Sequence, residues 1–174
     1  MKKLITLTFV IVFLCPISTH AQYHSIKRTV IQESEVPLSV IDAQRKQFYD
    51  GFVTEWQLHQ KDDSWENDLT HYMATFKKDG RFGNYAYYSP QGELYAYSLL
   101  VNPFDLGESI QELSQKSYEG SRIKSAELID IENPQVQIYR IRMNNEGQLN
   151  YLYFDINGNP IDKNRLPMKI FTFI

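Results

Sequence analysis

The chain has almost no cysteine. Its single cysteine, Cys15, lies within an N-terminal apolar stretch, so the rest of the sequence carries no thiol. Disulfide bonds, thiolate catalysis and cysteine-ligated metal sites are therefore excluded from everything that follows that stretch. We expect the folded part of the chain to be held together by its apolar core.

Motifs of the common catalytic and phosphate-binding sites are also missing. Beyond residue 21 the histidines are His24, His59 and His71, and no two of them have the spacing of a zinc-binding helix. The sequence contains no Gly-x-Ser-x-Gly elbow and no glycine-rich phosphate loop. Carboxylates are plentiful, but none forms a pair marked out by its position on a helix or at a strand end. No cofactor is predicted.

Positive charge is in deficit. The chain has 18 basic and 21 acidic residues, and its formal net charge is −3. Removal of the first 21 residues, which include two lysines, changes this net charge to −5. An acidic chain is poorly suited to bind nucleic acid or an anionic membrane surface, so neither is predicted as a partner.

The first 21 residues have the three parts of a secretory signal peptide. Residues 2–3 are basic, residues 4–14 are mainly apolar, and a short stretch of mostly small or polar residues ends at Ala21. The apolar run is too short to cross a bilayer comfortably, so we expect cleavage after Ala21 and no transmembrane segment in the mature chain. Lipid attachment at Cys15 is the alternative, but Leu14 stands where a small residue would be expected.

The remaining 153 residues contain a long internal repeat. Residues 85–92, Tyr-Ala-Tyr-Tyr-Ser-Pro-Gln-Gly, correspond to residues 151–158, Tyr-Leu-Tyr-Phe-Asp-Ile-Asn-Gly, 66 positions later. An earlier glycine turn, at residues 78–80 and again at 145–147, precedes each copy. A period this long with matching turns indicates two copies of one supersecondary unit.

Each copy is expected to begin with a helix and to continue as four antiparallel strands. Pro37 and Gly51 bound the first helical pattern, and Gly107 and Gly120 bound the second. Alternating strand patterns and glycine turns follow each helix. The chain is therefore predicted to be an α+β protein of two tandem repeats, each with one helix packed on a four-stranded antiparallel sheet.

The predicted divisions of the chain are a signal peptide at 1–21, a lead-in segment at 22–35, a first repeat at 36–101, a linker at 102–105 and a second repeat at 106–174. The lead-in segment is expected to be loose or to add an edge strand through residues 29–31.

Alternation along the strands assigns the two faces of each predicted sheet. Leu152 and Phe154 should point toward the helix, as should their counterparts Ala86 and Tyr88. The tyrosines expected on the helix-free face are Tyr85, Tyr87, Tyr95, Tyr97, Tyr151 and Tyr153. Tyrosine is enriched in recognition surfaces because it offers a large rigid ring and a hydroxyl group. The alternative is that these rings shield cross-strand neighbours or are buried where the two sheets meet.

The repeat resembles the PepSY-like, beta-lactamase-inhibitor-like (BLIP-like) family of small exported bacterial proteins. The residues that carry the resemblance are Val36–Pro37, Trp56, 72–80 and 85–92 in the first copy, and 139–147 and 151–158 in the second. The second copy lacks the helix-start proline and has Ala126 near the position of Trp56. The resemblance covers about residues 36–162. It implies a non-enzymatic binding protein in the periplasm or cell exterior of a Gram-negative-type bacterium, and no inhibitory residue is carried over from it.

Two further features offer candidate sites. Trp65 lies in the polar insertion 61–68, where an exposed ring would be a partner contact, whereas Trp56 lies in a strand and is expected in the core. Asp155, Asn157 and Asn159 have the alternating oxygens of the first half of a calcium loop. The distal bidentate Glu of such a loop is missing, and an Asn-Gly hairpin explains the same residues, so no metal is predicted.

Together these observations predict an exported, non-enzymatic module that recognises a protein, peptide or glycan through the open aromatic face of its sheets. Two alternative classes stay open. One is an envelope hydrolase that uses dispersed carboxylates, and the other is a purely structural envelope component or an inhibitor of a partner enzyme.

Overall fold

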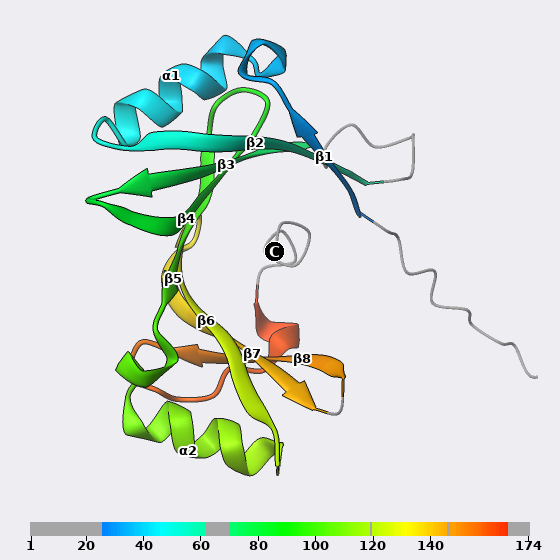
Figure 1. Cartoon of the computed structure of the whole chain (residues 1–174), viewed down its shortest axis with the longest axis vertical. Coiled ribbons are helices and arrows are strands. Elements are labelled where there is room, and N and C mark those ends of the chain that lie inside the picture. The colour runs from blue at the N-terminus through cyan, green and yellow to red at the C-terminus, as the bar shows by residue number, and fades with distance from the viewer. Residues whose placement is uncertain (1–25, 62–69, 119, 146, 167–174) are drawn as a thin grey trace, which may run out of the picture.

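Eight antiparallel strands form one continuous sheet, and two helices lie on its outer, convex side (Figure 1). The computed structural model describes residues 26–61, 70–118, 120–145 and 147–166. The predicted signal peptide, Cys15 and Trp65 lie outside these residues. Within the described part of the chain, no helix is long and apolar enough to span a membrane.

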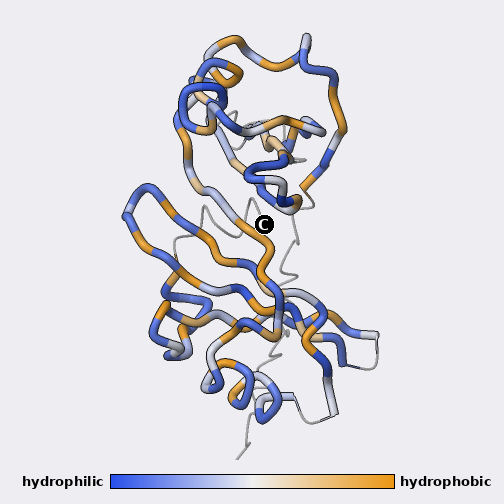
Figure 2. Tube along the Cα trace, turned by 60° about the vertical axis from the view of Figure 1, so that its left-hand side comes forward, coloured by the Kyte–Doolittle hydropathy of each residue, from blue (hydrophilic) through white to orange (hydrophobic). Residues whose placement is uncertain are grey.

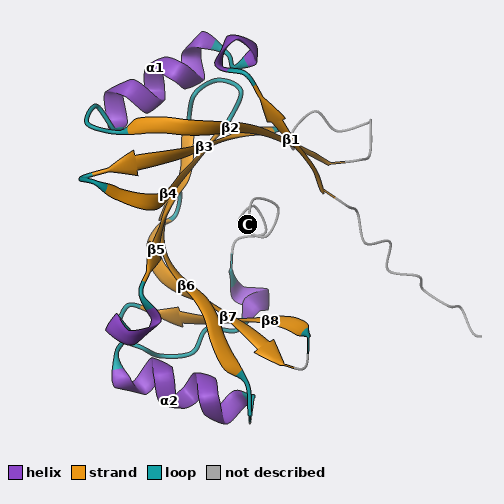
Figure 3. Ribbon diagram, in the orientation of Figure 1, coloured by secondary structure: helices purple, strands orange, loops and turns teal. Residues whose placement is uncertain are grey.

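The strands are ordered in the sheet as they are in the chain. They are β1 (Ile26–Ile31), β2 (Phe52–Lys61), β3 (His71–Lys78), β4 (Arg81–Tyr88), β5 (Leu94–Val101), β6 (Arg122–Glu132), β7 (Gln135–Asn145) and β8 (Gln148–Asp155). The helices are α1 (Leu38–Gln47) and α2 (Glu108–Ser117), and the short 3-10 turns are η1 (Glu33–Glu35), η3 (Pro103–Asp105) and η4 (Lys163–Arg165). Figure 3 shows both helices on the same side of the curved sheet.

The predicted α+β class with antiparallel strands is confirmed, but the two tandem repeats, each with its own four-stranded sheet, are not. β5 and β6 pair from Ala96↔Ile131 to Val101↔Ala126, so the two halves share one ladder. The lead-in segment contributes β1 at one edge. Between β8 and residue 166, where the described part of the chain ends, the pairing expected of a fourth strand is limited to the single bridge Phe154↔Pro160. Proline has no backbone N–H, so Pro160 cannot donate the hydrogen bond that a longer ladder would need from it.

The repeated sequence gives two turns with the same hydrogen bonds. After β4, the Ser89 amide donates to the Glu93 carbonyl at 2.9 Å, and the Ser89 hydroxyl accepts from the Glu93 amide at 3.1 Å. After β8, the Asp155 amide donates to the Asn159 carbonyl at 2.9 Å, and the Asp155 carboxylate accepts from the Asn159 amide at 2.8 Å. A short polar side chain that binds the backbone in this way fixes the turn. The duplication of the whole unit stays a prediction.

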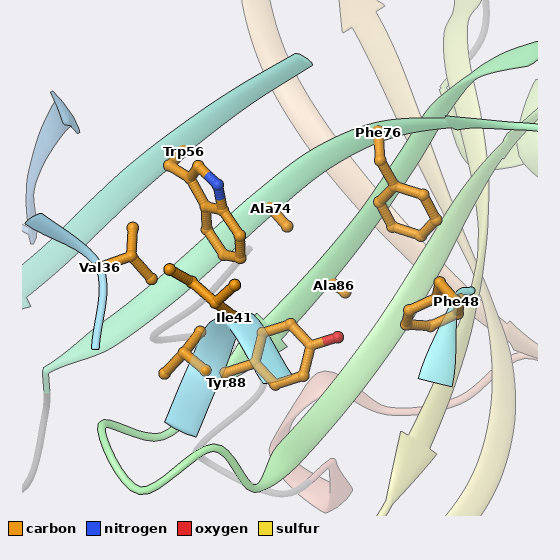
Figure 4. Close-up of a cluster of buried hydrophobic side chains, with 9 residues drawn as sticks. Val36, Ile41, Phe48, Trp56, Ala74, Phe76, Ala86 and Tyr88 are labelled. Atoms are coloured by element: carbon orange, nitrogen blue, oxygen red, sulfur yellow. The ribbon is translucent and has the colours of Figure 1, made fainter. Parts of the chain in front are cut away.

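Helix α1 is held on the first half of the sheet by an aromatic cluster (Figure 4). Trp56, Phe76 and Tyr88 are buried beneath it, which confirms the expectation that Trp56 belongs to the core. The Tyr88 hydroxyl donates to Gln44 Oε1 of α1 at 2.7 Å, which gives the hydroxyl and this carbonyl oxygen a partner where water is excluded. Each large apolar side chain buried here contributes about 1.5–3 kcal/mol. Burial also raises the pKa of Tyr88.

Helix α2 covers the second half of the sheet through a separate cluster. Ile110 of the helix packs with Ala126, Ile141 and Phe154, which are contributed by β6, β7 and β8. Figure 2 shows apolar and polar residues interspersed along the chain. Side chains alternate between the two sides of a strand, so each strand presents one side to a helix and the other to the concave face. The predicted orientation of Ala86, Tyr88 and Phe154 toward the helices is therefore correct.

A third cluster lies on the concave face, which was expected to be open. Its buried residues are Met73, Tyr87, Ala96, Ile129, Ile131, Ile138, Tyr153 and Leu166. The chain returns over this face after β8, where the Ile161 amide donates to the Tyr153 carbonyl at 2.8 Å. Figure 1 shows η4 inside the curve of the sheet, which is how Leu166 reaches the cluster. The helix-free face is thus partly a second core.

Each of the two matched turns packs closely on the start of a helix. A Cβ atom on Gly92 would lie 2.4 Å from the Ser39 carbonyl oxygen, and a Cβ atom on Gly158 would lie 2.5 Å from the Ser109 hydroxyl. Both glycines have φ in the left-handed region, +87° and +86°. Gly80 also has a left-handed φ, +75°, but no atom lies within 4 Å of the position of such a Cβ atom. A substitution of Gly80 therefore reports the cost of the left-handed backbone alone, without a steric clash.

We therefore expect Gly80→Ala, Gly158→Ala and Gly92→Ala to lower the free energy of unfolding by about 1, 2 and 3 kcal/mol, respectively. Gly92→Ala should cost more than Gly158→Ala because the backbone carbonyl of Ser39 cannot move aside, whereas the Ser109 hydroxyl can rotate away. Urea unfolding of the three variants would measure this. In a Ser109→Ala background, the effect of Gly158→Ala should shrink to that of Gly80→Ala. Equal losses in all three variants would contradict the proposed close contacts.

Candidate functional site

Two of the six predicted contact tyrosines belong to the core. Tyr87 and Tyr153 lie on the concave face as predicted, but only 4% and 6% of their surface is exposed. Burial is the main cause that raises the pKa of both phenols. The sheet curves and the chain returns over this face, so rings near its centre are covered. Neither residue is available as an exposed contact.

The prediction for Tyr97 is wrong, because this residue faces α1. Its hydroxyl donates to Asn84 Oδ1 at 2.7 Å, and its ring centroid lies 5.2 Å from that of Phe48. The cause is a β-bulge: consecutive residues Tyr87 and Tyr88 pair with Ala96 and Leu94, which leaves Tyr95 as an extra residue. An extra residue reverses the alternation of side chains beyond it.

Tyr95 itself packs against the concave cluster, and its ring centroid lies 5.5 Å from that of His71. Tyr85 is half-buried beside the same cluster, and Tyr151 is 43% exposed. Tyr85, Tyr95 and Tyr151 therefore combine partial exposure with a position on the concave face, and of these Tyr85 and Tyr151 lie together.

These two tyrosines line a hollow of about 260 Å³ on the concave face. Its walls come from both edge strands and from β2, β3, β4, β6 and β7, because the curvature of the sheet brings its ends toward each other (Figure 1). The lining residues are Arg28, Gln57, His59, Met73, Tyr85, Tyr87, Glu127, Arg140, Arg142 and Tyr151. We call this site the arginine–tyrosine hollow.

The hollow concentrates positive charge in an acidic chain. Three arginines and one glutamate line it, and a second carboxylate, Glu55, accepts a hydrogen bond from the side chain of Gln57 in the wall. Arg140 forms an ion pair with Glu127 at 2.5 Å, with only 11% and 15% of the two side chains exposed. The guanidinium of Arg140 also lies 5.5 Å from the ring centroid of Tyr151, a cation–π contact.

Arg142 differs from Arg140 because its Nε atom is buried and has no hydrogen-bond partner among the residues that the structure describes. It stands directly across the ladder from Tyr151. A guanidinium stays charged at all accessible pH values, so a buried donor on it favours any acceptor that reaches the hollow.

His59 forms part of the wall and is nearly fully buried. Its Nε2 atom lies 3.0 Å from Gln57 Oε1, and Arg28 stands directly opposite on β1. Burial, and secondly the charge of Arg28, lower the pKa of His59 to about 4. The imidazole is therefore neutral near pH 7 and contributes polarity without charge.

The sequence patterns singled out the tyrosines and missed the arginines. Arg140 and Arg142 alternate along β7 with Tyr139, Ile141 and Met143, whose side chains pack in the cluster under α2. Alternation therefore places both arginines on the opposite, concave face. Arg28 carried no such signal, because its position depends on the pairing of β1 with β2.

The weak calcium candidate at Asp155, Asn157 and Asn159 is a hydrogen-bonded turn. One Asp155 oxygen accepts from the amides of Asn157 and Asn159, and the other accepts from the Asn159 side chain at 2.8 Å. The bond from the Asn159 side chain is the main cause that lowers the pKa of Asp155. Across the described ranges, no group of three or more His, Cys, Asp or Glu residues is arranged to hold a metal ion.

No family model and no curated protein matches this chain. Among solved structures, it is similar to a protein of Bacteroides thetaiotaomicron that is provisionally described as calcium-regulated and periplasmic, with 17% identity, a TM-score of 0.34 and coverage of 78% of this chain and 94% of the other. It is also similar to a provisionally periplasmic protein of the DUF2874 family from Bacteroides vulgatus, with 15% identity, a TM-score of 0.33 and the same coverage. These scores are too low to support an argument about fold or function.

The depressed pKa of His59 makes stability depend on pH. The unfolded imidazole, with a pKa of 6.5, binds a proton more readily than the folded one, with a pKa of about 4. The contribution of His59 to the free energy of unfolding is therefore greatest above pH 6.5 and falls as the pH drops toward 4. Between about pH 7 and about pH 4.5 this contribution amounts to about 2 kcal/mol.

We expect His59→Gln to lack this contribution, so that its unfolding free energy falls less than that of the wild type over the same pH interval. Urea unfolding at both pH values would measure the difference. The second buried histidine, His71, is present in both proteins, so its effect cancels. Parallel pH profiles for the two proteins would show that His59 is not held neutral by the fold.

Proposed function

We propose that this protein is an exported, non-enzymatic binding module and that the arginine–tyrosine hollow is where its partner docks. The observation that carries the proposal is the convergence of Tyr85, Tyr151 and three arginines on one accessible hollow of the concave face. Tyrosine and arginine are the residue types most enriched at energetically important contacts. The resemblance to exported BLIP-like proteins and the signal peptide predicted at residues 1–21 support export.

The hollow is better suited to recognition than to acid–base chemistry. A general base works best with a pKa near the working pH, whereas the pKa of His59 is lowered to about 4. Glu127 is already occupied by Arg140. The groups that remain are hydrogen-bond donors and aromatic rings, which are groups that bind.

The walls of the hollow are also well supported. Met73 and Tyr87 belong to the buried concave cluster, so they fix the floor on which the more exposed groups stand. Preorganised contacts lose less conformational entropy on binding. The proposal narrows the predicted six-tyrosine surface to Tyr85 and Tyr151, the two more exposed rings that line the hollow.

The test is affinity capture with the mature protein, with the double variant Tyr85→Ser/Tyr151→Ser, and with Tyr49→Ser as a matched control. Tyr49 is 88% exposed and is not among the residues that line the hollow. We expect a partner that binds the wild type and the control, and binds the double variant at least about tenfold more weakly.

The double variant should keep a melting temperature within a few degrees of the wild type, because neither ring belongs to the buried set of the concave cluster. Equal capture by all three proteins would rule out the hollow as the docking site. A severe loss of thermal stability in the double variant would instead assign the two rings to the core.

A further inference from the structure

We infer that the arginine–tyrosine hollow receives the side-chain carboxylate of an acidic peptide segment and that Arg142 is the residue that holds it. The inference rests on the proposed function and adds the chemical class of the ligand. It starts from the three arginines of the hollow, which are not equivalent.

Arg140 already shows how this surface binds a carboxylate. Its Nη2 atom donates to Glu127 Oε2 across the β6–β7 ladder, and its guanidinium lies near the ring of Tyr151. The pair is largely shielded from water, which strengthens the charge-assisted hydrogen bond. A carboxylate and an aromatic wall thus satisfy one guanidinium of the hollow from within the chain.

Arg142 lies two residues further along β7 on the same face and lacks such an acceptor at Nε among the described residues. Its cross-ladder neighbours are Ser125 on β6 and Tyr151 on β8. Arg140 is paired on β6 with the carboxylate of Glu127, whereas Arg142 is paired there with the uncharged Ser125. A ligand carboxylate would supply what the chain itself supplies to Arg140. The planar guanidinium fork matches the two oxygens of a carboxylate.

The charge of the site favours a monoanion. The positive charges are those of Arg28, Arg140 and Arg142. The negative charges are those of Glu127, which lines the hollow, and of Glu55, which is close enough to act electrostatically on the Tyr85 phenol in the wall. One net positive charge is left, and His59 is neutral near pH 7. A single carboxylate balances this charge, whereas a phosphate dianion would exceed it.

The size of the hollow favours one side chain of a larger partner over an enclosed small molecule. Its volume of about 260 Å³ is below the range of about 300–1,000 Å³ that is typical of pockets that enclose drug-sized ligands. The ring of Tyr151 gives an apolar wall for the methylene groups of an aspartate or glutamate side chain, while the remainder of the peptide stays on the open concave rim.

The experiment is an NMR titration of the ¹⁵N-labelled mature protein with hexaglutamate, acetylated and amidated at its ends. Hexaglutamine with the same ends is the neutral control, and hexaglutamine with a free C-terminal carboxylate tests the other peptide source of the group. Sodium acetate, inorganic phosphate and a heparin oligosaccharide are the non-peptide arms. We expect hexaglutamate to shift the amides of β7 and β8 at lower concentration than any other probe.

Four variants test the residue assignment. Arg142→Gln should weaken hexaglutamate binding at least tenfold, and Arg142→Lys should weaken it by less because the charge is kept while the fork is lost. Arg81→Gln removes the same charge from an exposed position outside the hollow and should change the affinity less than twofold. Glu127→Gln should strengthen binding, because it removes the carboxylate that competes for the hollow.

Tighter binding of phosphate or of the heparin oligosaccharide than of hexaglutamate would overturn the assignment of a peptide carboxylate. Equal effects of Arg142→Gln and Arg81→Gln would overturn the role of Arg142. If partner capture depends on Tyr85 and Tyr151 yet is unaffected by hexaglutamate and by Arg142→Gln, this inference fails while the proposed function stands. If capture does not depend on the two tyrosines, the proposed function itself fails.

Discussion

The ladder between β5 and β6 is the constraint on which the rest of the structure depends. Six residue pairs, from Ala96↔Ile131 to Val101↔Ala126, join two helix-backed halves into one sheet. Strand twist accumulates across eight strands, and a sheet of this width curls. Because it curls, residues of the first and last strands reach a common hollow, which neither half alone would form.

The joined sheet carries buried clusters on both faces, and their positions explain which aromatic residues are accessible. The outer face carries a separate cluster under each helix, whereas the inner face carries one cluster that spans both halves. Tyr87 and Tyr153 come from equivalent positions of the repeated motif, yet they meet in that single inner cluster. Of the tyrosines predicted as contacts, Tyr85 and Tyr151 stay outside the buried part of that cluster and line the hollow, which is why the proposed recognition is limited to them.

Local patterns predicted those features that depend on a period of two within one strand. The orientation of Tyr88 and Phe154 toward the helices is of this kind, as is the strand position of Trp56. The orientation of Tyr97 was predicted wrongly because of the bulge at Tyr95. A bulge depends on how two strands pair, and the pattern within one strand does not reveal it. The arginine–tyrosine hollow was not predicted for the same reason. It contains residues of both β1 and β8, and these strands belong to one curved sheet because β5 pairs with β6.

The strict order of the strands has a consequence for how the chain folds. Every strand pairs with its neighbour in the sequence, and the longer connections, before β2 and before β6, contain the two helices. Each ladder therefore closes a modest loop, which keeps the entropic cost of each step small and favours rapid assembly for a sheet of this size. When the chain is synthesised from the N-terminus, each new strand can thus pair with the strand formed just before it.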